Sequence, residues 1–174
     1  MDIEEAIQTS IEYETKVRDV YVDAVNSATD PVGKRVFQVL VKEEQHHLKY
    51  LEKKLDELKN TGAVTTEGLE TSIPAITAIE AEADKLKTKL EPSESDRKYS
   101  DVELKMLKKA LEVEIETSEF YNRMVAELPD EGKKLFERFV EIEEGHKAIV
   151  QAEIDAVTGM GYWFDMPEFD LAGN

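Results

Sequence analysis

Apolar residues recur at every third or fourth position through most of the chain, the spacing that lines up side chains on one face of an α-helix. Four long stretches have this pattern, and it predicts an all-α protein built from four amphipathic helices. Near its middle, each apolar stripe is interrupted by polar side chains. The stripes are Ile7, Ile11, Glu14, Val17 or Arg18, and Tyr21; Phe37, Leu40, Glu44, His47, Leu51, Leu55 and Leu58; Leu104, Leu107, Leu111, Glu114, Thr117 and Tyr121; and Phe136, Phe139, Glu143, His146 and Val150.

Capping residues indicate where these helices begin and end. Asp30 followed by Pro31 is typical of an N-cap with proline at the first helical position, and LPDE at 128–131 separates the third helix from the fourth. Ser100 and Glu103 have the spacing of a capping box, so we expect the third helix to begin there.

The two halves of the chain resemble each other. The segment at 33–47 matches 132–146, and the segment at 11–21 matches 111–121. The aligned pairs include Gly33 and Gly132, Phe37 and Phe136, Glu44 and Glu143, His47 and His146, Glu14 and Glu114, and Tyr21 and Tyr121. The repeat predicts two similar helical hairpins that form one four-helix bundle.

The hairpins are joined by a long crossover at about 60–99, suited to a connection that runs the length of a bundle. We expect the bundle to occupy 1–158 and an aromatic tail to occupy 159–174, packed on its own domain or completing a partner interface. Within the crossover, helical spacing predicts a short amphipathic helix on the side of the bundle. Its apolar residues are Ile76, Ile79, Ala83, Leu86 and Leu90, and those of the tail are Tyr162, Trp163, Phe164 and Phe169.

The run EEQHH contains two overlapping Glu-x-x-His pairs, either of which could hold one metal ion from one side of a helix. Glu44 and His47 fill the steps between Leu40 and Leu51 on the apolar stripe, so we expect this pair to point inward. The other pair, Glu43 and His46, lies beside the stripe, and we place His46 at the surface or behind the ligands. Its counterparts in the repeat, Ile142 and Gly145, cannot bind metal.

Four carboxylates in one core would repel each other and lose hydration, at a cost of several kcal/mol each, unless they take up protons or surround cations. Two divalent ions balance four carboxylates, and two neutral imidazoles complete the shell, which predicts a dinuclear metal site. The alternative is a purely structural bundle with buried, protonated acids. The predicted ligands are Glu14, Glu44, His47, Glu114, Glu143 and His146.

Composition narrows the chemistry further. The chain has no cysteine, so a metal must be held by histidine and carboxylate. A net charge of -17 makes nucleic acid and anionic membranes improbable partners. The acidic N-terminal residues lack the basic and apolar segments of a signal peptide, and no stretch is apolar for long enough to span a bilayer, so we expect a cytoplasmic protein.

At these residues the chain resembles the ferritin-like di-iron carboxylate proteins, which take a Glu from each of two helices and Glu-x-x-His from each of the other two. The similarity, over 5–58 and 102–157, is greatest to the rubrerythrin-like branch, in which Glu is followed two turns later by Tyr, as in Glu14 and Tyr21. The resemblance implies that Glu44 and Glu143 bridge or chelate the irons and that Glu14 and Glu114 are terminal carboxylates. It also implies that His47 and His146 each supply one imidazole. Tyr21 and Tyr121 then either hydrogen-bond to the ligands or are plain core residues.

The chain departs from rubrerythrins in two respects. Those proteins carry a further Glu one turn after the third-helix ligand, where this chain has Thr117, and they usually carry a rubredoxin domain, which needs four cysteines. The first departure argues against their ligand-switching peroxidase chemistry. The second implies that electrons come from a separate donor, either a rubredoxin-type protein or another reductant.

The resemblance favours a non-haem di-iron oxidoreductase that reduces hydrogen peroxide or dioxygen in the bundle core. Alternatives are an iron-binding or storage protein with ferroxidase activity, and a dimanganese catalase or an oxygenase on the same bundle. Two iron ions are the expected cofactor, with manganese as the alternative and zinc as a substitute in purified protein. We also expect a homodimer.

Overall fold

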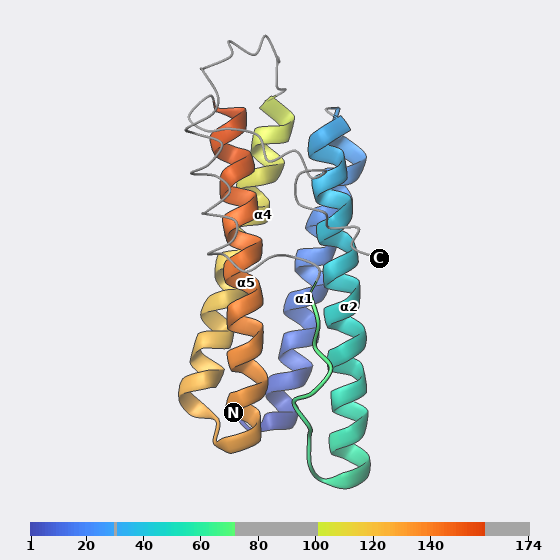
Figure 1. Ribbon diagram of the computed structural model, residues 1–174, viewed down its shortest axis with the longest axis vertical. Helices are drawn as coiled ribbons and strands as arrows, with labels where there is room; N and C mark the ends of the chain where they lie inside the picture. The colour runs from blue at the N-terminus through green and yellow to red at the C-terminus, as the bar shows by residue number, and fades with distance from the viewer. Residues whose placement is uncertain (30, 72–100, 159–174) are drawn as a thin grey trace.

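The computed structural model describes residues 1–29, 31–71 and 101–158, and this part of the chain is helical, with no strand. It contains four helices: α1 (Ile3–Ser27), α2 (Pro31–Thr61), α4 (Asp101–Glu127) and α5 (Asp130–Val157). They lie side by side along the long axis of the molecule (Figure 1). The prediction of an all-α protein with four helices is confirmed for the described residues.

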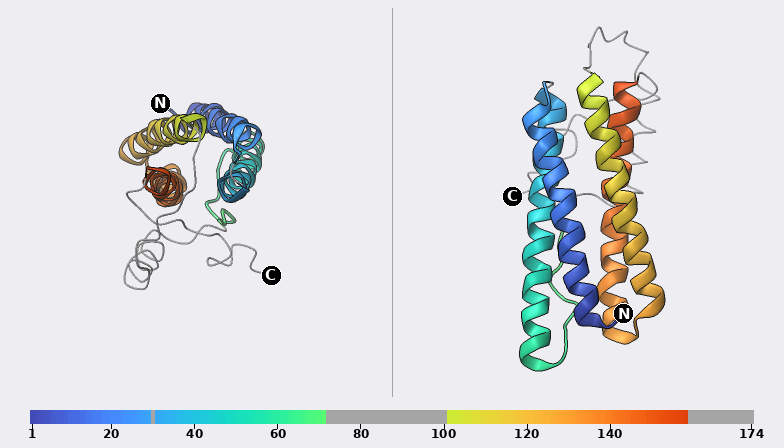
Figure 2. Two further views of the ribbon diagram at one scale, coloured as in Figure 1. Left: turned by 90° about the horizontal axis from the view of Figure 1, so that it is seen from above. Right: turned by 180° about the vertical axis from the view of Figure 1, so that it is seen from behind.

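The helices form a bundle in which α1 packs against both α2 and α4, and α4 packs against α5. Seen from above in Figure 2, the four helices surround a common centre. In Figure 1, α1 and α5 run up the view while α2 and α4 run down it. None of the four described helices carries an apolar stretch long enough to cross a lipid bilayer.

Two of the predicted helix boundaries are confirmed. Helix α2 begins at Pro31, and α5 begins at the predicted break, directly after Pro129. The predicted caps Asp30 and Ser100 lie outside the described residues. The start of α1 has a capping box that the pattern did not predict: the Glu5 amide donates to the Asp2 carboxylate at 2.9 Å, and the Asp2 amide donates back to Glu5 at 3.2 Å.

The apolar core is divided into two clusters, one on either side of a polar layer. One cluster lies around Val17, Tyr21, Phe37 and Leu40, and the other around Ile7, Leu51, Tyr121, Phe136 and Phe139. Within the first stripe, Val17 is buried and Arg18 is not. Five stripe residues at the edges of the core are only partly buried, because they lie where a helix face turns toward solvent: Ile11, Leu55, Leu58, Leu104 and Leu111.

After α2 the chain turns at Gly62 and residues 63–71 run back along the bundle as an extended segment (Figure 1). Gly62 has φ 76°, a left-handed backbone conformation that glycine adopts without strain. Val64 and Leu69 of this segment are buried against the second apolar cluster. The predicted crossover helix at 76–90 and the tail at 159–174 lie outside the described residues.

Candidate metal centre

The polar layer contains all six residues that the stripes single out, and each of them is fully buried. Each of the four helices contributes to the layer: α1 and α4 one Glu each, α2 and α5 a Glu and a His each. Because both the Glu and the His of α2 and α5 lie one turn apart, they project from the same side of the helix. The six residues are Glu14, Glu44, His47, Glu114, Glu143 and His146.

The His47 ring turns its Nδ1 atom toward the carboxylates. This nitrogen lies 3.2 Å from Glu14 Oε2, 3.3 Å from Glu44 Oε2 and 3.8 Å from Glu143 Oε1. Three acids from three helices therefore converge on one imidazole. The edge of the ring packs against Phe139 at a centroid distance of 5.6 Å, and this contact limits its rotation.

The Nδ1 atom of His146 also faces three acids, which come from α2, α4 and α5. This nitrogen lies 2.9 Å from Glu44 Oε1, 3.6 Å from Glu114 Oε1 and 3.6 Å from Glu143 Oε2. The two imidazole rings are stacked nearly parallel, with centroids 5.3 Å apart. Glu44 and Glu143 each lie close to both rings, so these two acids occupy the middle of the layer.

The two tyrosines cross between α1 and α4. Tyr21 donates its hydroxyl hydrogen to Glu114, and Tyr121 donates to Glu14, so each tyrosine holds the acid of the other helix. Burial raises the pKa of both hydroxyls well above the usual value, and the nearby carboxylates raise it further, so both remain protonated donors. The hydrogen bonds fix one oxygen of Glu114 and one of Glu14.

Burial acts to raise the pKa of all four acids, and their partners decide the net direction of the shift. It raises the pKa of Glu44 and Glu143 well above the usual value, and the negative charges of Glu14 and Glu114 add to this effect. Burial also acts to raise the pKa of Glu14, but hydrogen bonds and the charge of His47 outweigh it and lower that pKa to about 2. The pKa of Glu114 is lowered in the same manner by His146.

The pKa values of the two imidazoles are shifted by the same acids. Burial alone would lower the pKa of His47, but the charges of Glu44 and Glu14 raise it to about 10. The pKa of His146 is also raised, since its interaction with Glu114, whose Oε1 lies 3.6 Å from the ring nitrogen Nδ1, and the negative charges of Glu114 and Glu14 outweigh burial. Without metal, these shifts favour protons on Glu44, on Glu143 and on both imidazoles, which offset the negative charges of Glu14 and Glu114.

The donor set fits divalent metal ions. Among the described residues, both oxygens of Glu44 and of Glu143 have no hydrogen-bond partner, although native proteins rarely bury such oxygens unsatisfied. Two sets of three buried donor atoms lie within 4.8 Å of one another: Glu14, Glu44 and His47, and Glu44, Glu114 and His146. Nitrogen and carboxylate oxygen donors suit iron, manganese and zinc alike. This part of the chain therefore has buried groups that can hold a metal ion.

Glu43 is a further buried acid, beside the four of the polar layer, that the sequence reasoning missed. Its side chain is only 2% exposed, and one of its oxygens forms a third group of donors with His47 and His146. The signal was available in the repeat: its counterpart is the apolar Ile142, which is buried at the equivalent place on α5. His46, by contrast, is exposed to solvent.

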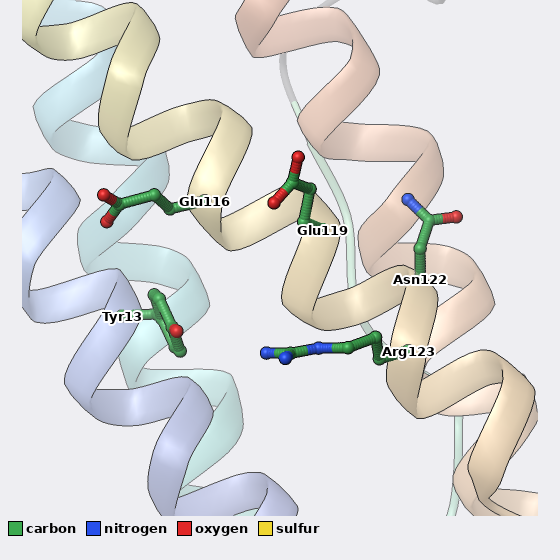
Figure 3. Close-up of a pocket in the computed structure, with 5 residues that line it drawn as sticks. All are labelled: Tyr13, Glu116, Glu119, Asn122 and Arg123. Atoms are coloured by element: carbon green, nitrogen blue, oxygen red, sulfur yellow. The ribbon is translucent and has the colours of Figure 1, made fainter.

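Thr117 faces the core but takes a backbone partner. Its hydroxyl donates to the carbonyl of Val113 at 2.9 Å, the bond that a buried threonine makes to the preceding helical turn. A surface hollow of about 540 Å³ lies between α1 and α4 (Figure 3). None of the six residues of the polar layer lines it. Its lining consists of Tyr13, Glu116, Glu119, Asn122 and Arg123.

Comparison of the chain with protein-family models, with curated proteins and with solved structures finds no match.

Proposed function

We propose that the protein is a di-iron oxidoreductase that reduces hydrogen peroxide or dioxygen in the core of a ferritin-like bundle. In this proposal two similar hairpins, α1 with α2 and α4 with α5, are joined by a crossover and each supplies half of the ligands. The rubrerythrin-like resemblance of the sequence favours this class. The observation that carries the proposal is the convergence of six fully buried acids and imidazoles from all four helices at one level of the core.

The ligand roles follow from the contacts of each side chain. Glu44 and Glu143 lie near both imidazoles, so each of these acids would be a ligand common to both ions if two were bound. Glu14 lies only on the His47 side and Glu114 only on the His146 side, which suits terminal ligands. With this division, each of two bound ions would have one imidazole and an equal share of the carboxylates.

The chain also controls the surroundings of the ions. The two apolar clusters exclude water above and below the layer, and this raises the strength of every electrostatic interaction within it. Tyr21 and Tyr121 hold the terminal acids in place and offer hydroxyl protons next to the site. Two ferrous ions, when bound, supply the two electrons that cleave an O–O bond.

Anaerobic titration with ferrous ion tests the first half of the proposal. We expect two ions per chain, and a pulse of hydrogen peroxide should then oxidise both within seconds, which stopped-flow absorbance can follow. Glu143→Leu should abolish this uptake. The matched control is Glu144→Leu, since Glu144 is the neighbouring acid, lies closer to solvent and pairs with Lys147 at 2.7 Å.

Two results would refute the proposal: no binding of ferrous ion by the wild-type chain, or bound iron that peroxide and dioxygen leave reduced. Iron oxidised in large excess over two per chain and retained in an assembly of many subunits would indicate storage instead. Sedimentation distinguishes the two, because a mineral core requires a closed shell.

A further inference from the structure

Glu43 lies at the edge of the polar layer and is held there by a residue beyond α2. Its Oε2 atom accepts a hydrogen bond from the Thr71 hydroxyl at 2.6 Å, and Thr71 ends the described extended segment that runs back along the bundle. The same carboxylate has an oxygen within 4.8 Å of a ring nitrogen of His47 and of one of His146. One acid outside the six thus lies beside both imidazoles.

The two imidazoles need an acceptor on their outer side. Both rings turn Nδ1 toward the central acids at 2.9–3.8 Å, so an ion bound in the layer would take its nitrogen ligand from Nδ1. The ring proton is then carried by Nε2. Both Nε2 atoms are buried, and neither has a hydrogen-bond partner among the described residues. Histidine ligands in metalloproteins almost always donate this second N–H to a carboxylate, carbonyl or water.

We propose that Glu43 is a positioning residue that accepts the outer N–H of His47 and His146, directly or through one water, and so orients both rings toward the metal ions. The rings are nearly parallel and 5.3 Å apart, so a single carboxylate can serve both. A separation of up to 4.8 Å suits a bridging water where no direct bond forms. The inference rests on the metal centre proposed above, but not on its reaction with oxidants.

This role makes the site asymmetric. The counterpart of Glu43 in the second hairpin is Ile142, so at this position of the repeat α2 supplies an acceptor and α5 does not. The acceptor is in turn held by Thr71, so the orientation of the rings is linked to the segment that follows α2. A substitution at Thr71 should therefore alter the orientation of the two imidazole rings through its effect on Glu43.

Zinc-loaded protein gives a readout that does not depend on redox activity. In long-range 1H–15N spectra of the wild-type chain, we expect both histidines to be protonated at Nε2, with protons that exchange slowly. Glu43→Ala should make this exchange fast and lower zinc affinity by about 10- to 100-fold while two ions still bind. Glu43→Gln, which keeps a carbonyl acceptor, should restore slow exchange. Glu52→Ala, at an exposed acid of the same helix, is the control.

Three outcomes would overturn the inference. Unchanged exchange and affinity in Glu43→Ala would show that the rings are oriented without this acid. Loss of one whole zinc ion would make Glu43 a ligand rather than a positioning residue. An equal loss of exchange protection and affinity in Glu43→Gln and Glu43→Ala would show that an acceptor at this position does not orient the rings. A wild-type chain that takes up no zinc refutes the metal centre itself, whereas a loaded chain inert to peroxide leaves the role of Glu43 intact.

Discussion

Replacing the two central acids by leucine should have opposite effects on the metal-free and the metal-loaded protein. Glu44 and Glu143 are fully buried, and their four oxygens have no hydrogen-bond partner among the described residues. In the metal-free chain each of these acids carries a desolvation cost of about 1–3 kcal/mol. The double variant Glu44→Leu/Glu143→Leu removes both acids and leaves two terminal acids to balance two imidazolium ions.

The expected gain for the metal-free variant is about 1–4 kcal/mol in the free energy of unfolding, the usual result when buried ionisable groups give way to apolar ones of similar size. The two contributions are not independent, because both acids contact the same imidazoles. For a chain of this length, each kcal/mol raises Tm by about 2–4 °C. With metal the wild type becomes the more stable of the two proteins. Free ion at 100 times Kd stabilises the wild-type chain by about 2.7 kcal/mol per site, whereas the variant, which binds no ion, gains nothing.

Thermal unfolding followed by circular dichroism measures Tm for the wild type and for the double variant, each with and without cobalt. The control is Glu12→Leu/Glu112→Leu, which removes the same charge at two exposed, aligned positions and should change the free energy of unfolding by no more than about 0.5 kcal/mol per site. The reasoning is refuted if the metal-free double variant unfolds at a lower temperature than the wild type, or if cobalt stabilises it as much as the wild type.

Three further predictions concern protons, tyrosine and lysine. Loading two divalent ions near neutral pH should release about four protons per chain, two from the acids and two from the imidazoles whose pKa is raised, so affinity rises with pH. Tyr121→Phe should keep two ions per chain but lower affinity at least about tenfold, because Glu14 loses its donor. Lys54→Ala should lower the free energy of unfolding by about 1–3 kcal/mol, equally with and without metal, since buried Lys54 bonds to Thr65 at 2.6 Å.

Each of these predictions has its own measurement. Calorimetric titration in buffers of different ionisation enthalpy counts the protons, and a release of one or none would contradict the charge balance of the layer. Competition with a chromogenic chelator measures the affinity of Tyr121→Phe, for which Tyr13→Phe is the control, and wild-type affinity would mean that the hydroxyl does not hold the ligand. Denaturant unfolding tests Lys54→Ala, where a metal-dependent loss would place the lysine in the site.

The polar layer could be predicted from the sequence because helical periodicity and the repeat agree. Each of the six residues replaces an apolar residue in a stripe, and burial of the stripe carries the polar side chain inward. Glu43 was missed because it lies at the edge of the stripe, where periodicity does not decide between the core and the surface. Lys54 was missed for another reason: its long apolar stem packs inward while its amine finds Thr65 and Glu57, and both partners depend on where the chain returns after α2.

The hydrogen-bond acceptors of the two tyrosines could not be predicted from the sequence pattern either. The sequence pairs Tyr21 with Glu14 on the same helix, but in the structure Tyr21 bonds to Glu114 and Tyr121 to Glu14. Which acid a tyrosine reaches depends on the relative height and rotation of α1 and α4, and these are set by packing across the interface rather than by spacing within one helix. The resemblance therefore implied that the tyrosines either hydrogen-bond to the ligands or are plain core residues, but not which acid each one holds.

The most direct test of the metal centre is anomalous diffraction from crystals loaded anaerobically with ferrous iron, recorded on both sides of the iron absorption edge. Two iron peaks in the polar layer, each with one of the two imidazoles as a ligand and with Glu44 and Glu143 between them, are the predicted result. A layer without iron, or iron bound only at the acidic surface, would contradict the claim that these six buried side chains form a dinuclear site.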